Sequence, residues 1–145
     1  MFLSVIKMPK GSFIIITLAV VVLTASLIVS FKNEGTKVVS ATDDLSVLGY
    51  ISSFDIEVLK EGLIEDEIKV PVSFDDVYKN YNKIQKDQGF DLESYKGKTL
   101  KRYTYPVINI EDETPHFVEV LTFDGIIVAA DVYSTSIEGS IRALK

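Results

Sequence analysis

Cysteine and tryptophan are absent from this chain of 145 residues, and histidine occurs once, as His116. Without cysteine the chain forms no disulfide, no thiolate metal site and no lipid-modified cysteine. A single histidine excludes the usual histidine-containing zinc sets. The acidic runs at 65–67 and 111–113 lack the spacing of an EF-hand. The sequence therefore predicts no cofactor, no metal site and no nucleophilic catalysis.

Excess positive charge is also missing from most of the chain. Residues 1–42 carry four lysines and one glutamate, a net charge of +3, whereas residues 43–145 carry eleven basic and twenty acidic residues, a net charge of −9. An acidic domain repels phosphate backbones, so nucleic acid is excluded as the expected partner.

Charge is absent altogether between Gly11 and Phe31. Residues 13–31 read FIIITLAVVVLTASLIVSF, and nineteen helical residues span roughly 28 Å, close to the ~30 Å thickness of a bilayer core. We interpret them as a single transmembrane helix that binds the lipid bilayer, with a cleaved signal peptide as the alternative. Lys7 and Lys10 precede the run, which favours a cytoplasmic N-terminus and an extracytoplasmic C-terminal domain.

This interpretation divides the chain into a basic tail (1–12), the membrane segment (13–31), a linker (32–42) and one globular domain (43–145). Within the domain, spacing predicts a short helix after Thr42, strands at 54–59 and 68–72, and a main helix over 73–89. Three further strands are predicted at 99–110, 117–123 and 126–133, the last two joined by an Asp124-Gly125 hairpin. The expected fold class is α+β, with one main helix on an antiparallel sheet of about four strands.

The main helix is expected to bury Phe74, Val77, Tyr78, Tyr81 and Ile84 against that sheet. The opposite side of this helix carries lysines, the first members of a basic stretch. An acidic stretch at 55–76 precedes it, so we expect a domain with one acidic and one basic side. The candidate anion-binding patch, for lipid headgroups or a cell-wall polymer, consists of Lys79, Lys83, Lys86, Lys96, Lys98, Lys101 and Arg102.

Residues 70–107 contain a long pattern of aromatic, amide and glycine positions. It consists of Phe74, Asp75, Val77, Tyr78, Tyr81, Asn82, Gln85, Gln88, Gly89, Phe90, Asp91, Leu92, Tyr95, Gly97, Lys98, Lys101, Arg102, Tyr103, Thr104 and Tyr105. This pattern resembles the bacterial domain-of-unknown-function family 4830. The resemblance covers about residues 45–140 and implies an N-terminal hydrophobic segment followed by one domain, but no activity. Family members tend to carry Gly-Gly-Asp-Val where this chain has Ala129-Ala130-Asp131-Val132.

These observations lead to three hypotheses about function. The first is an extracytoplasmic binding or accessory module, anchored to the cell membrane and without catalysis. The second is a small cell-envelope hydrolase that uses carboxylates, which requires two facing carboxylates in a concave pocket. The third is an accessory subunit of a larger membrane protein.

Overall fold

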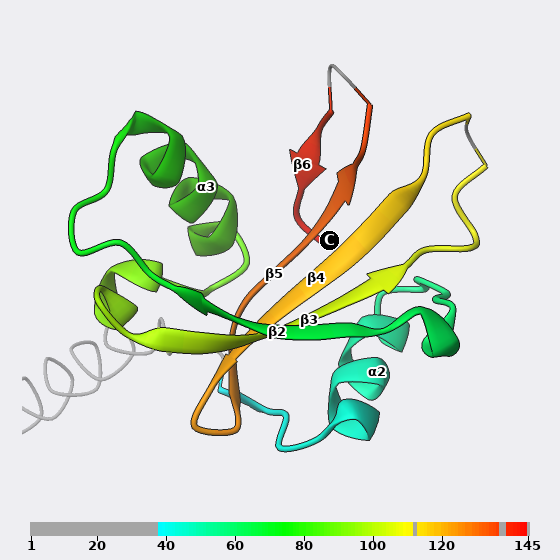
Figure 1. Cartoon of the computed structure of the whole chain (residues 1–145), viewed down its shortest axis with the longest axis horizontal. Coiled ribbons are helices and arrows are strands. Elements are labelled where there is room, and N and C mark those ends of the chain that lie inside the picture. The colour runs from blue at the N-terminus through cyan, green and yellow to red at the C-terminus, as the bar shows by residue number, and fades with distance from the viewer. Residues whose placement is uncertain (1–37, 112, 137–138, 145) are drawn as a thin grey trace, which may run out of the picture. The chain divides into compact units, whose positions relative to one another are not determined.

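The computed structural model describes residues 38–111, 113–136 and 139–144, all of which belong to one unit, Thr36–Lys145. Its centre is an antiparallel sheet with strand order β1-β5-β4-β3-β2, in which β6 also pairs with β5 (Figure 1). The strands are β1 (Val39–Ser40), β2 (Ile64–Lys69), β3 (Thr99–Pro106), β4 (His116–Phe123), β5 (Ile126–Ser134) and β6 (Ile141–Arg142).

Two short α-helices accompany the sheet, and an aspartate caps each of them. Asp43 accepts a hydrogen bond from the Ser46 N–H at the start of α2 (Asp44–Ser52). Asp75 accepts one from the Tyr78 N–H at the start of α3 (Asp76–Lys86). Such caps satisfy N–H groups that have no partner within the helix. Two 3-10 helices, η1 (Lys60–Gly62) and η2 (Leu92–Tyr95), complete the elements.

The helices lie on opposite faces of the sheet (Figure 1). The α2 face carries Tyr103, Tyr105, Val118 and Val120, which form one apolar cluster with α2. The α3 face carries the alternate residues of the same strands, and the partly buried Tyr78 and Tyr81 of α3 pack there. The period of two along each strand separates the two clusters.

The hairpin between β4 and β5 turns at Asp124 (φ 49°) and Gly125 (φ 73°). Two successive positive φ angles match a type I′ turn, whose twist suits the flanking strands. The hairpin predicted from Asp124-Gly125 is therefore confirmed.

The predicted fold class is wrong. The described chain is mostly antiparallel sheet, with six strands and two short α-helices, rather than one main helix on about four strands. The two added strands, β1 and β6, are each two residues long. Alternation needs at least four residues to be recognised, so these strands exist through their pairing with β5 and leave no sequence signal.

No helix of the described residues is long and apolar enough to cross a membrane. The predicted tail (1–12) and transmembrane helix (13–31) lie outside the described residues. Within the predicted linker (32–42), Val39–Ser40 form β1 and pair with Ile126–Ile127.

Three local predictions are also corrected. The strand predicted at 54–59 is reduced to one bridge between Val58 and Val107. The main helix begins at Asp76 rather than near Ser73. Val77 is 77% exposed rather than buried, because α3 turns Asn82 and Gln85 toward the sheet instead.

Candidate functional site

A row of charged side chains crosses the α3 face of the sheet. Asp66 of β2 lies opposite Arg102 of β3, and Glu119 of β4 lies opposite Asp131 of β5. Arg102 donates two hydrogen bonds to Asp66, at 2.7 and 2.6 Å, and one to Glu119 at 3.5 Å. The Arg102 guanidinium therefore bonds to two carboxylates directly. Asp131 is the next carboxyl group of the row and forms its hydrogen bonds with other residues.

Asp131 is 2% exposed and is held by α3. The Tyr81 hydroxyl donates to its Oδ2 at 2.7 Å, and Gln85 Nε2 donates to the same oxygen at 3.4 Å. Burial raises the pKa of Asp131 to about 6, although both hydrogen bonds favour the charged form. Burial, together with the nearby Asp131 carboxylate, raises the pKa of Tyr81 well above its usual value, so Tyr81 stays a donor.

Glu119 is the second perturbed carboxyl group of the row. Burial first, and then the charge of Asp131, raises the pKa of Glu119 to about 7, while Arg102 acts in the opposite direction. Its side chain is 15% exposed. Near neutral pH this carboxyl group therefore exchanges its proton with little cost in free energy.

Two neighbouring carboxyl groups with raised pKa values meet one requirement of the hydrolase hypothesis. The other requirement is a concave pocket, and among the described residues neither group lines the cavities at Ile108, Phe90, Thr122 or Ile84. Among the described residues no group of three His, Cys, Asp or Glu side chains could hold a metal ion. The contacts of Asp131 with Tyr81 and Gln85 instead serve to dock α3.

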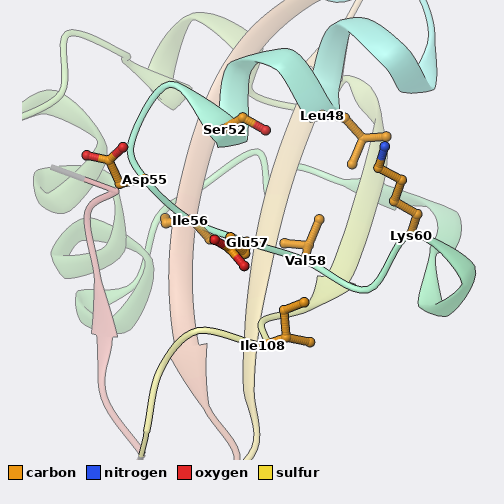
Figure 2. Close-up of a pocket in the computed structure, with 8 residues that line it drawn as sticks. All are labelled: Leu48, Ser52, Asp55, Ile56, Glu57, Val58, Lys60 and Ile108. Carbon is orange, nitrogen blue, oxygen red and sulfur yellow. The ribbon is translucent and has the colours of Figure 1, made fainter.

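A cavity of about 410 Å³ lies on the other side of the domain (Figure 2). Leu48 and Ser52 of α2 and Ile108 after β3 contribute to its wall. The segment before β2 contributes the remaining lining residues, Asp55, Ile56, Glu57, Val58 and Lys60. The cavity thus combines aliphatic side chains with two carboxylates and one ammonium group.

The wall of this cavity is tied together by Asn109. Its Oδ1 accepts a hydrogen bond from the Glu57 N–H at 3.0 Å, and its Nδ2 donates to the Asp55 carbonyl at 2.8 Å. The Ile108 N–H donates to the Glu57 carbonyl at 2.9 Å. These bonds join two segments about fifty residues apart, so the cavity is preformed.

A model of the family described as domain of unknown function (DUF4830) matches residues 45–132, more than half of the chain. The chain belongs to the DUF4830 family. The resemblance found from the sequence is thereby confirmed. No curated protein and no solved structure matches the chain.

The contacts of the DUF4830 domain give the amide positions of its pattern a structural role. Asn82 accepts from the Leu92 N–H at 2.8 Å and donates to Asp91 at 3.0 Å, which anchors the chain after α3. Gln85 and Gln88 bond to the backbone of β5. These residues stabilise the fold, and they do not by themselves define a binding site.

The predicted basic patch is spread over several surfaces of the DUF4830 domain. Lys79, Lys83 and Lys86 lie on α3, and Lys96 and Lys98 lie on the segment before β3. Lys101 and Arg102 are adjacent on β3, so their side chains point to opposite faces of the sheet.

Five members of the patch have carboxylate partners. Lys79 pairs with Asp76, Lys86 with Asp91 and Glu93, Lys96 with Glu93, Lys101 with Glu65, and Arg102 with Asp66 and Glu119. These pairs reduce the positive charge that the patch presents. The structure thus leaves anion binding by this set a prediction.

Sequence reasoning missed both the carboxyl row and the cavity. The cavity has no local signal, because its wall is formed by segments distant in sequence. The docking of α3 onto the sheet had a weak signal in the sequence, because Gln85 and Gln88 fall on the margin of the predicted apolar side of the helix expected at 73–89.

Proposed function

We propose that this domain is a non-catalytic binding or accessory module that recognises a segment of another protein. The observation that supports it is the preformed cavity beside Ile108. A cavity that exists before binding lowers the entropy lost when a ligand is ordered. Leu48, Ile56 and Val58 favour an aliphatic group. The two carboxylates of the lining outnumber the Lys60 ammonium and favour a cationic group.

The absence of catalysis is part of the same proposal. It is supported by the structural role of Asp131, which is buried and accepts hydrogen bonds from two side chains of α3. A general acid or base must lie within hydrogen-bond reach of its substrate. Asp131 has that reach only if α3 leaves the sheet.

An extracytoplasmic location at the cell membrane completes the proposal. It rests on the apolar composition of residues 13–31, which lie outside the described residues. Protease added to intact, wall-stripped cells is expected to digest the domain, and a protected domain would contradict this location.

The cavity is tested with the full-length chain in detergent micelles and the probe acetyl-Leu-Lys-Leu-amide. Binding is expected to shift the amide resonances of Val58 and Ile108. Ile108→Asp should abolish these shifts, because it places a charge against the aliphatic wall. Val72→Asp is the matched control, since Val72 is 76% and Ile108 58% exposed, and Val72 lies outside the cavity. Equal binding by the Ile108→Asp chain would remove the cavity as the site.

An anionic partner, a lipid headgroup or a cell-wall polymer, is the second candidate. Lys83 and Lys98 favour it, because neither forms an ion pair within the part of the chain that the structure describes. Vesicles of phosphatidylglycerol test this candidate. Vesicle binding that Lys83→Ala weakens and Ile108→Asp leaves unchanged would assign recognition to the lysines instead.

A further inference from the structure

The sheet has two edges, and the structure treats them differently. The outer edge of β5 is covered by β1 at one end and by β6 at the other. Between them, Gln85 accepts from the Ala130 N–H at 2.9 Å and Gln88 donates to the Ala130 carbonyl at 2.7 Å. Side chains of α3 and of the turn that follows it therefore complete the hydrogen bonding of this edge where neither strand reaches it.

The opposite edge is β2, which pairs with β3 over six residues without a bulge. No further strand pairs with it among the described residues (Figure 1). Every residue of β2 is exposed except Ile68, which is partly buried. Proteins protect exposed edges with bulges, proline or very short strands, and β2 has none of these over 64–69.

The backbone groups that β2 leaves unpaired can be assigned. The Val70 N–H donates to the Lys98 carbonyl, which places Val70 in a hydrogen-bonded pair with the chain before β3. Hydrogen-bonded and non-hydrogen-bonded pairs alternate along an antiparallel ladder. Glu65, Glu67 and Lys69 therefore point their N–H and C=O groups away from β3, toward solvent.

This edge is protected by charged side chains, three carboxylates and Lys69. Glu65, Asp66 and Glu67 are consecutive, and Glu65 and Asp66 pair with Lys101 and Arg102. Glu67 forms no ion pair within the described ranges of the chain. Two copies of β2 in antiparallel contact would set these carboxylates against one another, which disfavours self-association. Lys101 and Arg102 reduce the charge that Glu65 and Asp66 present, so Glu67 contributes most to the attraction of a strand of opposite sign.

We propose that β2 is a docking edge for an extended cationic segment of another protein, which adds to the sheet as a further strand. This inference rests on the proposed function, a module that recognises another protein, and it names the partner's chemistry. Backbone hydrogen bonds to Glu65, Glu67 and Lys69 hold the segment. Its basic residues alternate, so that they meet Glu65 and Glu67 on one face of the sheet. Its intervening residues are apolar and β-branched, and they meet Ile64, which is 57% exposed, and Ile68 on the other face.

The test uses the full-length chain in detergent micelles and the probe acetyl-Thr-Lys-Val-Lys-Val-Lys-Thr-amide. Binding is measured by fluorescence anisotropy of the labelled peptide. The matched peptide with glutamate in place of lysine is expected not to bind. Binding of the lysine peptide should weaken in 1 M salt, where the screening length falls to about 3 Å.

Two variants at one position separate the backbone from the charge. Glu67→Pro removes an N–H that points to solvent, so the ladder to β3 is kept, as for proline on natural edges. It should weaken peptide binding at least about tenfold, since it removes a donor and blocks the edge. Glu67→Gln keeps the N–H and removes the charge, and should weaken binding about threefold.

The outcomes distinguish this inference from the cavity. Wild-type affinity in Glu67→Pro, or equal binding of the glutamate peptide, overturns the docking edge while leaving the cavity proposal intact. Loss of peptide binding in Ile108→Asp with retention in Glu67→Pro moves the site to the cavity. A dimer that dissociates in Glu67→Pro shows that a second copy is the occupant and also overturns the proposal. If Glu67→Pro shows no thermal unfolding transition, the double variant Glu65→Lys, Glu67→Lys takes its place in the test. The same loss of peptide binding is expected of it.

Discussion

The two faces of the sheet are stabilised by different chemistry. On the α2 face, helix α2 buries Val47 and Ile51 completely against the tyrosines and valines of β3 and β4. Even the Tyr105 hydroxyl, which is buried there, has no hydrogen-bond partner among the described residues. On the α3 face, helix α3 buries amide side chains, Asn82 and Gln85, and holds a buried carboxylate.

This difference determines how each helix tolerates change. Apolar burial is roughly proportional to area and has no direction, so it accepts neighbours of similar volume. Buried hydrogen bonds contribute little net free energy when made, but an unmade one costs about 1–3 kcal/mol. Helix α3 is therefore positioned by specific partners, and α2 by contact area.

The largest expected effect is on the α2 face. Ile51→Ala should lower the free energy of unfolding by ~2–5 kcal/mol, from lost burial and the cavity that remains. Chemical denaturation measures it. Val77→Ala on α3 is the control, and should change stability by less than about 0.5 kcal/mol because Val77 is 77% exposed. Comparable losses in both variants would contradict the observed phase of α3.

The next effect belongs to the carboxyl row and depends on pH. The pKa values of Glu119 and Asp131 are raised in the folded state, to about 7 and about 6 from ordinary values of 4.5 and 3.8. The folded state thus binds more protons between about pH 4 and 7, so its stability falls as pH rises through that window. From pH 5 to pH 8 the loss should be ~1–4 kcal/mol, at about 1.4 kcal/mol per pKa unit.

Melting temperatures between pH 5 and 8 measure this dependence. Glu119→Gln should flatten the profile, and Glu61→Gln, which changes an exposed carboxylate on η1, should leave it unchanged. The hydrogen bonds from Arg102 lower the pKa of Asp66. Burial opposes the change at Asp91, but its hydrogen bond with Asn82 and the smaller effects that act in the same direction together outweigh burial, and the pKa of Asp91 is lowered too. Both groups therefore change the stability only below this pH window. A melting temperature that rises with pH in both Glu119→Gln and the wild type would contradict the raised pKa values of the carboxyl row.

The smallest effect compares two tyrosine hydroxyls, one on each face. Tyr81→Phe should cost about 1–3 kcal/mol, since it leaves the Asp131 carboxylate without its 2.7 Å donor. Tyr105→Phe should be neutral or slightly stabilising, because it removes a buried hydroxyl that lacks a partner. Thermal melts of both variants at pH 7 measure the two changes in stability. If Tyr105→Phe were the more damaging change, the α2 face would hold a polar contact beyond those observed.

Much of the strand pattern could be predicted from the sequence. The alternation at 117–123 and 126–133 and the Asp124-Gly125 turn lead to β4, β5 and their hairpin. The main helix was predicted as well, and Tyr78 and Tyr81 pack on the sheet as expected, but the buried side is rotated toward Asn82 and Gln85 and leaves Val77 exposed. Gln85 is 0% exposed and Val77 is 77% exposed, an inversion that no hydropathy scale anticipates.

What the sequence determined by itself is local: charge balance, turn chemistry, strand periodicity and the DUF4830 pattern at 70–107. Tertiary structure decided the rest. Residues 39–40 and 141–142 are strands because β5 offers them partners, and Asp131 and Glu119 have raised pKa values because folding buries them together. The cavity exists because Asn109 joins two distant segments. The physical reason is common to all three, since pairing, burial and desolvation depend on neighbours that sequence distance does not specify.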